Sequence, residues 1–206
     1  MTTIRKGQAS DSKVLASLIL SSAEPLLPYI FGSRQAAYEY LCLAGKEVDG
    51  QYSSARHYVA ETRTLPSNQE VKGCMSLWHH EMPSSFHQAT VTSLSNHLCA
   101  QQLKHIISIN DALARLFLPP SDTQLCIGHL AVANECQGEG IGGQLIAHAV
   151  ECAKNMSKSV LVLDVDVQNH QAVGFYEKHG FSALDTRHFA PTQQSFIRME
   201  RGVGNP

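Results

Sequence analysis

The sequence lacks an excess of charge of either sign. Its 206 residues carry 16 Lys plus Arg and 18 Asp plus Glu, which give a formal net charge of -2. A protein that neutralises a nucleic-acid backbone needs a basic excess, so neither nucleic acid nor an anionic membrane surface is a predicted partner. Hydrophobic residues make up 43% and charged residues only 17%, which excludes a disordered chain and predicts a globular protein.

Long apolar runs are also missing. No uninterrupted stretch approaches the roughly 20 residues that a membrane-spanning helix requires. The apolar run at residues 14–20 follows two lysines and so resembles a secretory signal peptide. However, Val14, Leu15, Leu18 and Ile19 fall on one face of a helix, and Asp11 precedes them. We therefore predict an amphipathic first helix and a cytoplasmic protein.

Paired cysteines and metal-binding motifs are absent as well. The six cysteines include no Cys-x-x-Cys pair, and a chain of this length can fold without disulfides, so we interpret them as reduced thiols. His79, His80 and Glu81 are the only tight cluster of metal-ligating residue types, and no His-Glu-x-x-His motif occurs. We therefore predict that the protein has no metal site.

The length favours a single domain over residues 1–206, since a domain commonly has roughly 100–200 residues. A short strand is expected at residues 4–6 and a second helix at 34–44. Strands at 57–61 and 71–78 should form a hairpin about a turn at 66–68. Between prolines, residues 82–122 carry apolar side chains at helical intervals, which predicts one or two helices.

The segment that carries chemistry begins at Leu125. A strand-type apolar run at 125–132 is followed, after five residues, by Gln137-Gly138-Glu139-Gly140-Ile141-Gly142-Gly143 and then by the apolar face of a helix. A glycine-rich turn that opens a helix presents bare backbone N–H groups at the positive end of the helix dipole. This pattern favours binding of a phosphate or pyrophosphate.

The same glycines also satisfy Gly-x-Gly-x-x-Gly, and Asp164 ends the next strand, as in a Rossmann dinucleotide-binding unit. In that unit the strand runs almost straight into the first glycine. Here residues 133–137 separate Val132 from Gly138, and over 130 residues precede the motif. A Rossmann-type dinucleotide-binding protein is therefore the less favoured alternative.

Three separated elements agree in order and spacing with the GNAT-type N-acetyltransferase superfamily, which this segment resembles. They are the strand Leu130-Ala131-Val132, the loop Gln137-x-x-Gly140-x-Gly142, and Asn169-x-x-Ala172-x-x-Phe175-Tyr176-x-x-x-Gly180-Phe181. The resemblance implies an α/β fold with a mixed, mostly antiparallel sheet of six to seven strands. This sheet would be splayed between the fourth and fifth strands, with helices on both faces. Residues 82–122 depart from the family pattern and would be a helical insertion between the third and fourth strands.

The resemblance further implies acetyl-coenzyme A as co-substrate, and direct attack of a primary amine on its acetyl group without a covalent enzyme intermediate. Unpaired backbone groups of the splayed strand can pair with the pantetheine arm, and one N–H there can stabilise the oxyanion. The cofactor-binding residues implied in this way are Leu130, Ala131, Val132, Gln137, Gly138, Glu139, Gly140, Ile141, Gly142, Gly143, Asn169 and Tyr176.

Two catalytic residues are carried over from the resemblance. Tyr176 would protonate the departing thiolate, since a phenol of pKa about 10 is a workable donor to a thiolate of pKa about 8.5. Asp164 stands where many relatives have a glutamate, and it can act as the base or orient a water. His129, His79 and Glu81 are further candidates for the base. Acylation of Cys126 or Cys136 is a competing mechanism, but neither has a clear His and acidic partner.

A non-catalytic acyl-coenzyme A sensor or an interaction module is the alternative in a second function class. For the enzyme, the acceptor is predicted to be a small-molecule or peptide amine. The sequence leaves open the identity of this amine and the oligomeric state, a homodimer included.

Overall fold

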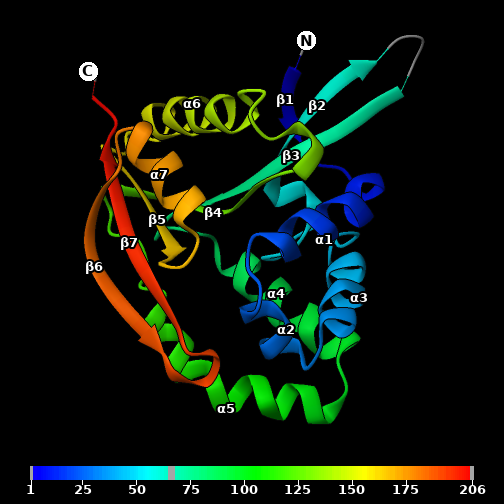
Figure 1. Ribbon diagram of the computed structural model, residues 1–206. Helices are drawn as coiled ribbons and strands as arrows, with labels where there is room; N and C mark the ends of the chain where they lie inside the picture. Colours follow the sequence, from blue (N-terminus) through cyan, green and yellow to red (C-terminus); the bar gives the residue numbers. More distant parts are fainter. Residues whose placement is uncertain (1, 65–67, 205–206) are drawn as a thin grey trace. The chain divides into compact units, whose positions relative to one another are not determined.

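The computed structural model describes residues 2–64 and 68–204 (Figure 1). The chain divides into two compact units, each built from several separate segments. The first unit comprises Met1–Ser76, Met82–Ile107 and His129–Leu145, and the second comprises Leu77–Glu81, Ser108–Gly128 and Ile146–Pro206. The prediction of a single domain over the whole chain stays a prediction.

The described strands form one seven-stranded sheet with the order β1-β2-β3-β4-β5-β7-β6. The β4–β5 pair is parallel, whereas the pairs β1–β2, β2–β3, β5–β7 and β6–β7 are antiparallel. The predicted mixed, mostly antiparallel sheet of six to seven strands is therefore confirmed. The strands are β1 (Thr2–Lys6), β2 (His57–Thr64), β3 (Asn68–Trp78), β4 (Gln124–Val132), β5 (Val160–Asp166), β6 (Ser182–Phe189) and β7 (Gln194–Gly202).

The pairing between β4 and β5 is short. It joins Gln124 to Val160, Leu125 to Leu161 and Cys126 to Val162, whereas β4 continues to Val132. By contrast, β5 pairs with β7 from Val160 to Asp166. A short pairing is what a splay between the fourth and fifth strands requires, because it leaves backbone groups of β4 available to another partner.

The β2–β3 hairpin was predicted from two strand-type runs, and its antiparallel register confirms it. His57 lies opposite Ser76, and Val59 lies opposite Cys74. Residues 66 and 67 of the predicted turn lie outside the described residues.

Helices of the first unit follow the predicted apolar patterns. In α1 (Ser12–Ser21), Leu15 and Ile19 are fully buried. Ser33 caps the start of α3 (Arg34–Ala44), because its Oγ accepts a hydrogen bond from the amide of Ala36 at 3.0 Å. Between them, α2 (Leu26–Phe31) is a separate short helix that ends at Gly32, whose φ of 93° requires a glycine. Leu15, Ile19, Leu27, Phe31, Leu41, Val59 and Cys74 belong to the core of this unit.

The predicted helical insertion is present as two helices, α4 (Ser84–His97) and α5 (Ala100–Leu116). Within the first unit, side chains of α5 bond to carbonyl oxygens of α2. Gln102 Nε2 donates to the oxygen of Phe31 at 3.1 Å, and His105 Nε2 donates to that of Tyr29 at 3.0 Å. The first half of α5 is therefore held to α2 by hydrogen bonds.

The second unit contains the long curved pair β6–β7, which Figure 1 shows beside β5. α7 (His170–Lys178) contacts β5, and α6 (Ile141–Asn155) begins in the first unit and continues into the second. The buried residues of the second unit include Leu161, Leu163, Phe189 and Met199.

Short 3-10 turns complete the described elements: η1 (Ala9–Asp11), η2 (Ser54–Arg56), η3 (Asn134–Cys136) and η4 (Ala190–Thr192). Over the described ranges, none of the helices has the length and apolar character that crossing a membrane requires.

Candidate active site

The glycine loop between β4 and α6 lies in the first unit. Gly138 and Gly140 have φ values of 86° and 80°, in the left-handed region that side chains rarely adopt. A Cβ at either position would meet no atom within 4 Å, so the backbone conformation, and not crowding within the chain, calls for glycine. Gln137 stabilises the loop, because its Nε2 donates to Val132 O at 3.3 Å and to Asn134 Oδ1 at 3.1 Å.

The start of α6 presents a row of backbone donors. The amide of Gln144 donates to Gly140 O at 3.1 Å, which is the first bond of the helix. Within the described part of the chain, the amides of Gly140, Ile141, Gly142 and Gly143 have no acceptor. Free N–H groups at the positive end of a helix form an anion-binding site, so the loop can hold a phosphate or pyrophosphate, as predicted from its glycines.

His129 interrupts the regular geometry of β4. Its φ is 48°, which is uncommon for a residue other than glycine and is often associated with functional sites. The half-buried side chain places Nδ1 3.4 Å from Ser22 Oγ and its ring 5.6 Å from the ring of Tyr52. Strand alternation therefore could not predict where this ring lies.

His57, which sequence reasoning did not single out, lies near His129. The ring centroids of His57 and His129 are 6.4 Å apart. Burial lowers the pKa of His57 to about 4 and that of His129 to about 3, so both imidazoles are neutral at neutral pH. No motif surrounds His57 in the sequence, and only the β2–β3 register brings it to the interior.

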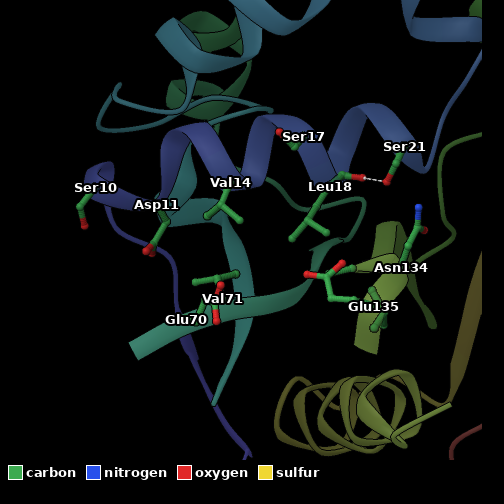
Figure 2. A pocket seen from close by; sticks show the side chains of 12 residues that line it. Ser10, Asp11, Val14, Ser17, Leu18, Ser21, Glu70, Val71, Asn134 and Glu135 are labelled. Atoms are coloured by element: carbon green, nitrogen blue, oxygen red, sulfur yellow. Dashed lines mark hydrogen bonds between the residues drawn. The ribbon is translucent and has the colours of Figure 1, made fainter. Parts of the chain in front are cut away.

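A cavity of about 580 Å³ lies against α1 in the first unit. Figure 2 shows Asn134 and Glu135 of η3 on one side of it and Leu18 and Ser21 of α1 on the other. Hydroxyl and carboxylate groups make up much of its polar surface, which suits a ligand that donates hydrogen bonds. Its lining residues are Ser10, Asp11, Val14, Ser17, Leu18, Ser21, Glu70, Val71, Val132, Ala133, Asn134 and Glu135.

Asp164 lies in the second unit, where two arginines bind its buried carboxylate. Arg187 Nη2 is 3.1 Å from Oδ1, and Arg198 Nη1 is 3.2 Å from Oδ2. The same guanidinium groups donate to the carbonyl oxygens of Leu116, the last residue of α5, and of Leu118, just after this helix. Burial raises the pKa of Asp164, while Arg198 and Arg187 act in the opposite direction. This arrangement favours an anchoring role for Asp164 over proton transfer.

Asn169 and Tyr176 lie at the two ends of α7, also in the second unit. Asn169 Oδ1 accepts the amide of Ala172 at 3.0 Å and so caps the helix. Tyr176 is 7% exposed and packs against Phe175 and Phe181. Burial raises the pKa of its hydroxyl. Tyr176 therefore keeps its proton at neutral pH, as an acid catalyst must.

The remaining candidates are less suited to catalysis. Glu81 bonds to Lys158 Nζ at 3.1 Å, and this bond lowers the pKa of Glu81. Burial raises the pKa of Cys126 to about 12 and also raises that of Cys136, so neither thiol is a ready nucleophile. Among the residues described, no group of three or more His, Cys, Asp or Glu side chains is placed to hold a metal ion.

Comparison with known proteins gives one family. Residues 53–181 match the model of the acetyltransferase (GNAT) family. N-alpha-acetyltransferase 30 of Schizosaccharomyces pombe is 36% identical over 55 residues, which cover 27% of this chain and 37% of that protein. Peptidyl-lysine N-acetyltransferase YjaB of Salmonella typhimurium is 29% identical over 124 residues, which cover 55% of this chain and 78% of that protein.

Solved structures share the fold over nearly the whole chain. An N-acetyltransferase from Staphylococcus aureus Mu50 has a TM-score of 0.67 at 16% identity and covers 96% of this chain and 99% of that one. N-acetylglutamate synthase from Neisseria gonorrhoeae, solved with coenzyme A and N-acetyl-glutamate, has a TM-score of 0.54 at 14% identity, over 100% of this chain and 36% of that one. The family match covers more than half of the sequence, and so this chain belongs to the GNAT acetyltransferase family.

Proposed function

We propose that the protein transfers the acetyl group of acetyl-coenzyme A to a primary amine by direct attack. The observation that carries this proposal is the row of amides from Gly140 to Gly143, which have no acceptor in the described chain and open α6 after the loop that follows β4. A pyrophosphate satisfies such donors and complements the helix dipole. Membership of the GNAT family supplies the reaction class.

The residues of the loop fit the cofactor. Gly138 and Gly140 leave open space where a Cβ would stand, so a diphosphate can approach the backbone closely. The proposed cofactor-binding set is Leu130, Ala131 and Val132 of β4, residues 137–143, Asn169 and Tyr176. Acetyl-coenzyme A, when bound, supplies the activated acetyl thioester. A backbone N–H of β4 would then stabilise the negative charge that develops on the thioester oxygen.

Tyr176 is the proposed acid that protonates the departing thiolate. Burial raises the pKa of its hydroxyl, so the hydroxyl is protonated at neutral pH and can donate a proton. Asp164, the other residue predicted to be catalytic, is held by two guanidinium groups, and we propose that it anchors the end of α5. The base stays open among His129, His79 and Glu81, since burial lowers the pKa of His129 to about 3 and so weakens its imidazole as a proton acceptor.

The names of the relatives support one class of acceptor. The names of the two curated relatives describe acetylation of an N-alpha amine and of a peptidyl lysine. Peptides with a free N-terminal amine or a lysine are therefore the first acceptors to test, ahead of small polyamines.

The test joins binding to turnover. Calorimetry of the full chain should show binding of acetyl-coenzyme A and no uptake of NAD. Release of free thiol should follow when a short peptide carrying a free N-terminal amine and one lysine is added. Binding without turnover on peptides, polyamines or amino acids would instead support the non-catalytic sensor, and uptake of NAD alone would overturn the proposal.

A further inference from the structure

The cavity beside α1 is not used by the proposed acetyl transfer, and it has the size of a ligand site. Its volume of about 580 Å³ falls within the range of roughly 300–1,000 Å³ that is typical of small-molecule pockets. Among the described residues of the glycine loop, 137–143, none lines it, and Val132 at the end of β4 is its link to the proposed cofactor strand. The cavity is therefore separate from the proposed diphosphate site.

Part of the cavity surface is apolar. Val14 and Leu18 of α1 point toward Val71 of β3 (Figure 2), and Val132 of β4 adds to the same surface. A ligand with an aliphatic chain is stabilised here, because the cavity removes its methylene groups from water.

The polar groups of the cavity are mainly hydrogen-bond acceptors. Asp11, Glu70 and Glu135 contribute carboxylates, which only accept hydrogen bonds when ionised. Ser21 also acts as an acceptor, because its hydroxyl donates its proton to Leu18 O at 2.8 Å. A ligand of this cavity must therefore donate hydrogen bonds, and an anion such as the cofactor diphosphate does not fit it.

Glu135 is the carboxylate with the greatest capacity for a further partner. Lys72 Nζ is 2.8 Å from Glu70 Oε2 but 3.9 Å from Glu135 Oε1, and the longer distance is beyond hydrogen bonding. The carboxylate of Glu135 therefore makes no hydrogen bond within the described chain. Figure 2 shows it directed from η3 toward Leu18 of α1. A second cation can bind Glu135 here while Lys72 stays bonded to Glu70.

Arg5 leaves a similar excess of negative charge near Asp11. Its Nη1 bonds to Asp11 and its Nε to Glu61, each at 2.7 Å. One guanidinium thus serves two carboxylates, as the ammonium of Lys72 does. The two groups together contain more carboxylates than cations, and this excess attracts a positively charged ligand.

We propose that the cavity binds an alkylammonium group, in which a primary ammonium is carried by a short aliphatic chain. The ammonium has three N–H donors, which it directs to Glu135 and the neighbouring acceptors, while its chain packs on Leu18 and Val71. A free diamine and the side chain of a lysine both present this chemistry. Binding here does not require coenzyme A, so the inference goes beyond the proposed acetyl transfer.

Calorimetry of the full chain without coenzyme A tests this site, with cadaverine as the probe. We expect saturable binding of cadaverine and none of pentanediol, which has the same chain without charge. Glu135→Gln should weaken cadaverine binding by roughly tenfold, because it removes a charge-assisted hydrogen bond. Glu151→Gln is the matched control, because Glu151 is also exposed and pairs with a lysine, Lys154, at 3.1 Å, and it should bind cadaverine as the wild type does.

A peptide with a blocked N-terminus and a single lysine separates the two sources of the group. If the peptide competes with cadaverine and is weakened by Glu135→Gln, the site takes lysine side chains. If cadaverine alone binds, the site takes a free diamine. Three outcomes would overturn the proposal: no binding of either probe, equal affinity of Glu135→Gln and wild type, or binding of pentanediol as tight as that of cadaverine. Because coenzyme A is absent, none of these outcomes depends on acetyl transfer.

Discussion

Buried polar groups are arranged differently in the two units. In the second unit, the carboxylate of Asp164 bonds to both Arg187 and Arg198, and the buried Nζ of Lys158 bonds to Glu81 and to a carbonyl oxygen, although Nε of Arg187 is buried without a partner among the described residues. In the first unit, Nε2 of His57 also has no partner there, and this side chain carries no charge-paired neighbour among the bonds described for it. Paired charges fix the packing of the chain, whereas an unsatisfied buried group retains the capacity to bind. We therefore associate the first arrangement with stability and the second with binding.

The largest expected effect tests the paired carboxylate of Asp164. Asp164→Asn keeps the shape of the side chain but removes the carboxylate that binds the buried guanidinium of Arg198, and it leaves Arg187 with Asp185 alone. We expect the free energy of unfolding, measured by urea denaturation, to fall by about 3–5 kcal/mol. Glu151→Gln, which removes one exposed partner of Lys154, should change it by less than about 0.5 kcal/mol.

The opposite result for Asp164→Asn would break the comparison. If turnover is lost while the free energy of unfolding is unchanged, Asp164 is a catalytic residue, as the sequence resemblance implies, and the anchoring role is wrong.

The pH dependence of stability tests the unsatisfied group. The pKa of His57 is lowered from 6.5 to about 4 by burial, so between these values the unfolded chain binds a proton that the folded chain does not. Stability is therefore fully present above pH 6.5 and falls as the pH drops toward 4. This loss is about 3 kcal/mol for His57, at 1.36 kcal/mol per pKa unit.

Urea denaturation of wild type and His57→Leu between pH 7 and pH 4 measures this loss. The variant should show the flatter profile, and the remaining slope should reflect His129, whose pKa is also lowered. Parallel profiles for the two proteins would show that folding does not lower the pKa of His57.

Tyr176 sharpens the comparison, because it is a buried residue of the second unit to which we assign a chemical role. Tyr176→Phe removes only the hydroxyl and keeps the ring packing against Phe175 and Phe181. We expect kcat to fall roughly 100-fold, with little change in the thermal unfolding midpoint. Tyr40→Phe, whose hydroxyl lies 3.5 Å from Ser93 Oγ, is the control. Equal activity of Tyr176→Phe and wild type would reduce Tyr176 to a core aromatic residue.

The sequence predicted the fold better than it predicted the roles of individual side chains. Apolar periodicity identified α3 and β5, and the glycine pattern placed the loop before α6, because these features depend on neighbouring residues. The partners of Asp164 could not be predicted, since Arg187 and Arg198 lie 23 and 34 residues away and only the β5–β7–β6 pairing brings them together. His57 was missed for a similar reason, because its neighbour His129 comes from another strand.

The smallest expected effect concerns the unsatisfied donors of the glycine loop. Gly140→Ala places a Cβ on a residue with a φ of 80°, which should cost about 1–2 kcal/mol in backbone strain. There is open space at this position, so the cost is conformational and not steric, and the loop can relax by turning its amides away. We therefore expect a measurable loss of coenzyme A affinity by calorimetry, together with a small loss of stability.

Gly174→Ala, within α7 and also in open space, should instead stabilise the chain by about 0.5–1 kcal/mol without affecting that affinity. If both variants bind coenzyme A as the wild type does, the loop amides are not the site of the diphosphate.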